Sequence, residues 1–143
     1  MRNKGFTLIE LLVAMSVMAV LMSLALVSYQ ASKKAARDSK RKADLEQIRS
    51  ALEIYRSDCG VYPGSLSNPL VGVSPPCPST DVYLQEVPQD PLAPARTYYY
   101  DYNMTNNTYA LCASLENGTG TVTGCGVSGS CGEADCNYKV VNP

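Results

Sequence analysis

The chain has 143 residues, a formal net charge of −1 and no histidine, which suits one small domain. It therefore lacks the commonest general base and the usual Cys/His set of zinc ligands, and it carries no Gly-rich phosphate loop. This composition argues against an enzyme.

The first element is an apolar stretch, Phe6–Val27, with no Pro or Gly and a single charged residue, Glu10. A membrane-spanning helix needs about 20 apolar residues, so the stretch is long enough to cross a bilayer. The basic prefix, residues 1–5, would also suit a secretory signal peptide cut near Ala25 or Ala31. The acidic residue, and a helical pattern that continues past the apolar run, favour a membrane helix that the mature protein keeps.

The junction Lys4-Gly5-Phe6-Thr7-Leu8-Ile9-Glu10 resembles the leader junction of type IV pilins and type II secretion pseudopilins. In that family a prepilin peptidase cuts after the glycine and N-methylates the new first residue. The resemblance implies a leader over residues 1–5, cleavage between Gly5 and Phe6, and methylation of Phe6. It also implies that residues 6–28 form a helix for both membrane insertion and polymerisation.

Glu10 lies one helical turn after the amine that cleavage would expose on Phe6. An unpaired buried carboxylate costs several kcal/mol, and a partner of opposite charge offsets most of this cost. We predict that Glu10 pairs with the Phe6 amine of its own chain in the bilayer, or with that of a neighbour in a filament. The alternative is a tolerated glutamate among the lipid headgroups.

A continuous helix is expected to about Ser57, with an amphipathic stem over residues 29–57, because the sequence has no Pro or Gly in this range. The stem carries one apolar stripe at helical spacing, formed by Leu45, Ile48, Leu52 and Tyr55. Extended backwards, the stripe reaches Arg41 and Asp38. We therefore expect it to fade there, leaving Lys33–Lys42 as an exposed neck while the head packs on the rest of the stem.

Charge divides the chain into a basic stem and an acidic head. Between Lys33 and Arg56 eight basic residues stand against four acids, whereas residues 57–143 contain two basic residues and eight acids. The basic block could bind nucleic acid, but a solvated helix face beside a membrane, with Asp38 and Lys42 as an i,i+4 pair, is the favoured interpretation. We predict no nucleic-acid partner.

All six cysteines lie in the head, residues 58–143, and their even number predicts a disulfide framework in an oxidising compartment. They are Cys59, Cys77, Cys112, Cys125, Cys131 and Cys136. The head would then lie outside the membrane, although the positive-inside rule would keep it in the cytoplasm. Cys77 could pair with Cys59, and of the fifteen possible pairings we favour Cys112 with Cys136 and Cys125 with Cys131.

The head begins where Gly60 caps the helix, and a Pro-rich irregular loop follows over residues 64–80. Residues 98–102 and 108–115 are strand-like and are joined by a hairpin loop, and residues 137–141 are a candidate last strand. The predicted fold class is α+β: a long N-terminal helix with a small antiparallel sheet, the pilin fold.

Two further segments, residues 43–63 and 83–92, are similar to the major pseudopilin of type II secretion systems. That resemblance implies a calcium site near the end of the head. Here Glu116, Glu133 and Asp135 are the only nearby acids, and they do not form a dense series of oxygen ligands. We expect no metal or other cofactor, with disulfides fixing this region, and keep calcium as the alternative.

These features favour a structural subunit of a helical type IV pilus-like filament, most closely a major pseudopilin. A type IV pilin for adhesion, twitching or DNA uptake is one alternative, and a membrane-anchored or secreted binding module that does not polymerise is another. The resemblance implies as partners copies of the chain itself, a prepilin peptidase, an inner-membrane platform protein, an assembly ATPase and, before assembly, membrane lipid. It implies a single-pass inner-membrane protein with a cytoplasmic N-terminus and an outside head, which later joins an extracytoplasmic filament.

Overall fold

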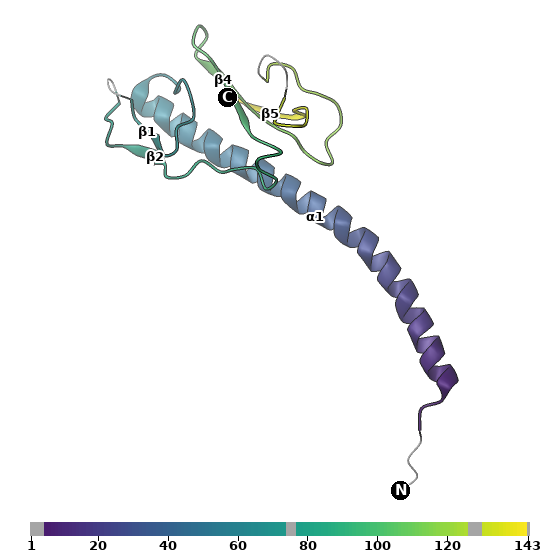
Figure 1. Ribbon diagram of the computed structural model, residues 1–143. Helices are drawn as coiled ribbons and strands as arrows, with labels where there is room; N and C mark the ends of the chain where they lie inside the picture. Colours follow the sequence, from purple (N-terminus) through teal and green to yellow (C-terminus); the bar gives the residue numbers. More distant parts are fainter. Residues whose placement is uncertain (1–4, 74–76, 126–129, 143) are drawn as a thin grey trace. The chain divides into compact units, whose positions relative to one another are not determined.

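The structure, a computed structural model, describes residues 5–73, 77–125 and 130–142 (Figure 1). The chain forms two compact units, residues 1–36 and residues 37–143. One helix runs through both units, and the described strands all lie in the second. The elements are α1 (Leu8–Cys59), β1 (Leu70–Val71), β2 (Val82–Leu84), β3 (Tyr99–Asn103), β4 (Thr108–Ala113) and β5 (Tyr138–Val141).

The helix α1 is continuous over 52 residues, as the absence of Pro and Gly predicts. It ends at Gly60, whose φ of +77° favours glycine and whose N–H donates to the carbonyl of Arg56 at 2.8 Å. The predicted long helix and its glycine C-cap are confirmed. The helix extends to Cys59, slightly beyond the expected end at Ser57.

In the first unit, α1 exposes its apolar side chains. Those large apolar residues between Leu8 and Leu26 whose exposure the structure describes are 52–82% exposed. They occur on all sides of the helix, which is typical of a helix surrounded by lipid or by other helices. The apolar part of α1 is also long enough to cross a membrane.

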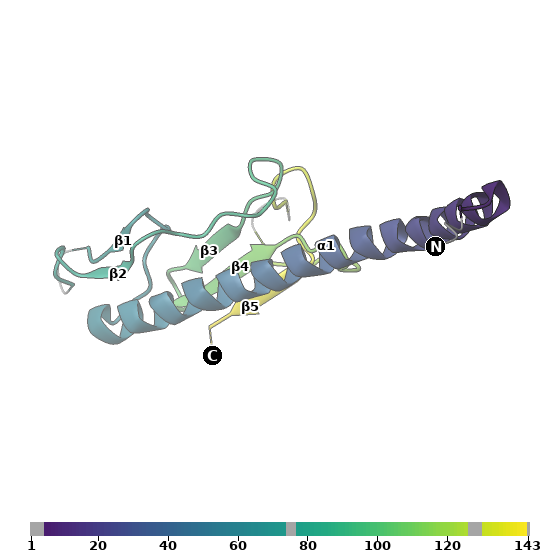
Figure 2. The same cartoon turned by 90° about the horizontal axis from the view of Figure 1, so that it is seen from below.

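In the second unit, a three-stranded antiparallel sheet of order β3-β4-β5 packs on α1. Figure 2 shows these strands lying along the helix, while β1 and β2 form a separate two-stranded ribbon. The predicted apolar stripe is confirmed, since Leu45, Ile48 and Leu52 are each 0% exposed. The predicted α+β fold is confirmed as well.

The middle strand, β4, is covered on both faces. Because side chains alternate along a strand, Tyr109, Leu111 and Ala113 join the core against α1, whereas Ala110 and Cys112 join a second cluster on the opposite face. The hairpin β3–β4 and the last strand β5 lie where the sequence predicts them. The ribbon β1–β2 was not predicted, because its strands are only two and three residues long.

Candidate functional site

The N-terminal junction contains a capping box formed by a threonine and a glutamate three residues later. The side chain of each residue accepts a hydrogen bond from the backbone N–H of the other. The carboxylate of Glu10 accepts hydrogen bonds from the N–H of Thr7 at 3.0 Å and from its hydroxyl at 2.7 Å. In return the N–H of Glu10 donates to the Thr7 hydroxyl at 3.3 Å. This geometry fixes the start of α1 at Leu8 and gives Glu10 a partner in its own chain.

Gly5 and Phe6 precede this cap in exposed, non-helical backbone, and the Phe6 side chain is 84% exposed. The predicted cleavage site thus lies in exposed backbone outside the helix, and cleavage there stays a prediction. The nitrogen of Phe6 is here a peptide nitrogen that follows Gly5. The pairing of Glu10 with a free Phe6 amine therefore stays a prediction. The role of Thr7 was missed, although the Thr-x-x-Glu spacing signals it.

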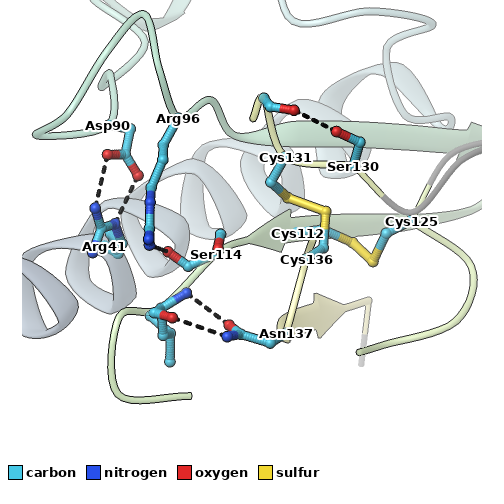
Figure 3. Close-up of a disulfide and its surroundings, with 12 residues drawn as sticks. Arg41, Asp90, Arg96, Cys112, Ser114, Cys125, Ser130, Cys131, Cys136 and Asn137 are labelled. Atoms are coloured by element: carbon cyan, nitrogen blue, oxygen red, sulfur yellow. Dashed lines mark hydrogen bonds and ion pairs between the residues drawn. A yellow bond between two sulfur atoms is a disulfide. The ribbon is translucent and has the colours of Figure 1, made fainter. Parts of the chain in front are cut away.

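The second unit contains a largely buried ion cluster, here named the arginine cluster, which consists of Arg37, Asp38, Arg41, Asp90 and Glu116. Its centre is Arg41, whose side chain is 0% exposed and donates twice to the equally buried Asp90, at 2.7 and 3.0 Å. Figure 3 shows this pair, with Arg41 extending from α1 toward the loop that carries Asp90. Arg41 also donates to Asp38 at 2.8 Å and to Glu116 at 3.1 Å.

The arginine cluster joins α1 to the loop after β4. Arg37 donates to both carboxylate oxygens of Glu116, at 2.6 and 2.7 Å. Asp38 accepts hydrogen bonds from the N–H groups of Glu116 and Asn117, at 2.8 and 2.9 Å. These bonds cross 75 to 79 positions of sequence, so the cluster fixes where this loop sits on the helix.

Hydrogen bonds lower the pKa values of two acids in the cluster, Glu116 and Asp38. Hydrogen bonds from Arg37 lower the pKa of Glu116 from its ordinary value of 4.5 to about 2, and bonds from Arg41 act in the same direction against burial. Burial raises the pKa of Asp38, but the N–H groups of Glu116 and Asn117 and the guanidinium of Arg41 outweigh it. The net result is a pKa below the ordinary 3.8.

The cluster corrects two expectations about the stem. The exposed neck over Lys33–Lys42 was wrong at Asp38 and Arg41, which are 6% and 0% exposed. The predicted pair of Asp38 with Lys42 was wrong too, since Asp38 bonds to Arg41 and the Lys42 ammonium lies 5.5 Å from the centre of the Tyr138 ring. A signal existed, because these polar residues continue the helical spacing of the apolar stripe.

All six cysteines are paired in three disulfides: Cys59–Cys77, Cys112–Cys125 and Cys131–Cys136. The first ties the end of α1 to the loop before β2, which confirms the expected pair. The favoured pairing of the other four was wrong. These four cysteines lie near one another beside β4 (Figure 3), and they form one cluster in which each is at most 1% exposed.

The acid Glu116, near the end of the head, is bonded to arginines. Both oxygens of the Glu116 carboxylate accept hydrogen bonds from guanidinium groups, whose positive charges oppose a cation. In the described ranges, no group of three or more His, Cys, Asp or Glu side chains is placed to hold a metal ion.

Comparison with known families agrees with this geometry. Residues 1–26 match the family described as the prokaryotic N-terminal methylation motif, which places the chain in the class of proteins that carry this motif. Residues 28–127 match the family described as type II secretion system protein G. The chain belongs to the type II secretion system protein G family.

Similar curated relatives are named type II secretion system core protein G. The chain is 32% identical to those of Pectobacterium carotovorum subsp. carotovorum and Dickeya chrysanthemi, and 28% identical to that of Aeromonas hydrophila, over 97 residues in each case. The match covers 63% of this chain and 62%, 63% and 68% of the three relatives, so the chain spans less than two thirds of the first two. No solved structure matches the chain.

Proposed function

We propose that this chain is a structural subunit of a helical filament, the major pseudopilin of a type II secretion system. The observation that carries the proposal is the leader junction followed by an exposed apolar helix. Such a helix needs lipid or other helices around it, and a polymer of parallel subunits supplies the second. The family match over residues 28–127 favours this role over a type IV pilin or a binding module that does not polymerise.

Before assembly, the subunit spans the inner membrane once, through residues 6–28. Its N-terminus is cytoplasmic, where a prepilin peptidase removes residues 1–5 and methylates Phe6, and its disulfide-containing head lies outside. Exit from the bilayer exposes a large apolar area, so spontaneous extraction is unfavourable. A cytoplasmic ATPase acting through an inner-membrane platform protein supplies the work.

During assembly, Glu10 exchanges its partner. In the single chain its carboxylate bonds to Thr7, and in the filament it meets the methylated amine of a neighbouring Phe6. Both states keep the carboxylate satisfied, so the exchange costs little and fixes the axial register of neighbouring helices.

The subunit works without catalysis and without a resident metal. The disulfides and the arginine cluster take the place of a calcium ion in fixing the end of the head, since Glu116 is already bonded to two arginines. A chelator should therefore leave the unfolding temperature of the head unchanged, whereas a reductant should lower it.

The test combines filament imaging with mass spectrometry of the first mature residue. In its own assembly system, the wild-type chain should give filaments whose subunits begin with N-methylated Phe6. Glu10→Ala should insert and be processed but should assemble at least tenfold fewer filaments. The control Glu46→Ala, at an exposed stem position, should assemble normally. A mature N-terminus near Ser32 would refute the proposal, and normal filaments from Glu10→Ala would refute the role of Glu10.

A further inference from the structure

The structure divides the basic block of the stem by residue type. Arg37 and Arg41 bond to acids of the arginine cluster. The lysines Lys33, Lys34 and Lys40 are exposed. None of these three forms an ion pair with an acid in the part of the chain that the structure describes. The fold of the head thus accounts for the arginines and leaves the lysines without a role.

Lys33 and Lys34 stand on the less favoured side of a membrane helix. They follow the apolar run closely, whereas membrane proteins keep most Lys and Arg of short flanking segments on the cytoplasmic side. In the proposed orientation these two charges oppose export of the head. Their position is therefore best explained by an opposite charge that they meet after export.

Spacing along α1 places the two lysines close to the lipid headgroups. Residue 17 is the middle of residues 6–28, and Lys33 follows it by 16 residues, or about 24 Å at 1.5 Å per residue. From the centre of a bilayer the hydrocarbon extends about 15 Å, and the headgroups extend to about 20–22 Å. In an upright helix the backbone of Lys33 thus lies only slightly beyond the headgroups.

The Lys33 side chain points back along the helix. Side chains on an α-helix tilt toward its N-terminus, which is here the membrane side. The Lys33 ammonium lies 4.6 Å from the centre of the Tyr29 ring, one turn nearer the apolar run. Tyr29 is 54% exposed, and tyrosine is typical of the membrane interface. This tilt brings the charge of Lys33 to the level of the headgroups.

We propose that Lys33 and Lys34 bind the anionic headgroups of phospholipids in the outer leaflet of the inner membrane. The inference rests on the proposed function, which supplies the membrane and the orientation. The ammonium groups donate hydrogen bonds to phosphate oxygens, and each lysine near an anionic surface strengthens binding about fivefold. These contacts hold the helix at one depth in the bilayer, and they break when the subunit leaves for the filament.

The test uses the full chain with one fluorescent reporter. The chain has no tryptophan, so Tyr29→Trp supplies a single indole beside Lys33. This parent chain is reconstituted in vesicles that mix phosphatidylcholine brominated in its acyl chains with unbrominated phosphatidylglycerol. Bromine quenches tryptophan, so quenching against lipid composition gives the relative affinity of the two lipids at this position. Phosphatidylglycerol should be preferred by about fivefold or more at low salt, and the preference should shrink at about 1 M salt.

Three variants in the Tyr29→Trp background assign the preference to these lysines. K33A/K34A should bring the two affinities to within about twofold of each other, and K33R/K34R should keep the preference because it keeps both charges. The matched control is K40A. Lys40 is also exposed but follows Lys33 by seven positions, so its removal should leave the preference unchanged.

Equal affinity for the two lipids in the parent chain, or an unchanged preference in K33A/K34A, would overturn the inference and leave filament assembly as proposed. An equal loss from K40A would overturn it too, because the general charge of the stem would then attract the lipid. Equal lipid affinity in the parent, with fewer filaments from K33A/K34A, would assign the lysines to acids of a neighbouring copy instead. A wild-type chain that prefers phosphatidylglycerol but never forms filaments would refute the proposed function and keep the lipid contact.

Discussion

The two units of the chain place apolar side chains in opposite environments. In the first unit the described large apolar residues from Leu8 to Leu26 are at least half exposed, whereas in the second unit Leu45, Ile48 and Leu52 are fully buried. The first unit is apolar all round, and the second has one stripe that meets a sheet. The second unit thus completes its core within the chain, while the first depends on surroundings that the chain does not supply.

The strongest way to break the second unit is to remove the centre of its arginine cluster. Arg41→Ala should lower the free energy of unfolding by about 3–5 kcal/mol, because it leaves the buried Asp90 carboxylate without its counter-charge. Urea unfolding of the full chain in detergent, followed by tyrosine fluorescence, measures the loss. The neighbouring Lys40→Ala is exposed and should change stability by less than about 0.5 kcal/mol. Equal behaviour of the two variants would show that the cluster does not stabilise the head.

A matched pair of leucines tests the contrast between the units directly. Leu52→Ala removes a fully buried side chain and should cost about 2–5 kcal/mol of unfolding free energy. Leu21→Ala, at a position 61% exposed, should cost less than about 0.5 kcal/mol in the same measurement. Filament yield should respond to Leu21→Ala even though head stability does not. A large loss of head stability from Leu21→Ala would contradict the division into two units.

Local pattern made much of this fold predictable. The apolar stripe, the glycine cap and the β3–β4 hairpin follow from spacing and turn residues that are close in sequence. The leader junction is likewise a short continuous motif. Each of these features is determined by residues only a few positions apart.

The features that sequence reasoning missed depend on distant partners. Arg41 looked like an exposed basic residue because its partners Asp90 and Glu116 lie 49 and 75 positions away. The pairing of the last four cysteines could not be deduced either, because all four share one cluster. A prediction from apolar residues alone assigns charged residues to the surface. The buried face of the helix was therefore expected to end before Arg41 and Asp38, which are in fact buried.

A smaller effect is expected from a polar contact inside the second unit. The hydroxyls of Tyr62 and Tyr109 donate to the carboxylate of Glu53, at 3.0 and 2.9 Å. Glu53→Ala should cost about 1–3 kcal/mol, because it leaves two largely buried hydroxyls without an acceptor. Glu53→Gln retains an acceptor and should cost less, and the exposed Glu46→Ala should be nearly neutral. In thermal unfolding, the melting temperature should fall most in Glu53→Ala, less in Glu53→Gln and least in Glu46→Ala.

The last expected effect is a dependence on acid pH that comes from Glu116 in the second unit. The pKa of Glu116 is about 2 in the folded head against an ordinary value of 4.5, because Arg37 and Arg41 bond to its ionised form. The folded state therefore binds fewer protons than the unfolded state between these values. The contribution of Glu116 is fully present above pH 4.5 and is lost as the pH falls toward 2.

Urea midpoints measured from pH 5 to pH 2.5 test this dependence. Wild-type stability should fall across the range, and Glu116→Gln should be less stable at pH 5 and should lose less on acidification, since its amide does not titrate. Glu133→Gln, at an exposed position, should keep the wild-type slope. A slope unchanged in Glu116→Gln would mean that other carboxylates cause the acid sensitivity. In that case the bonds from Arg37 and Arg41 would not favour the ionised form of Glu116 as the geometry requires.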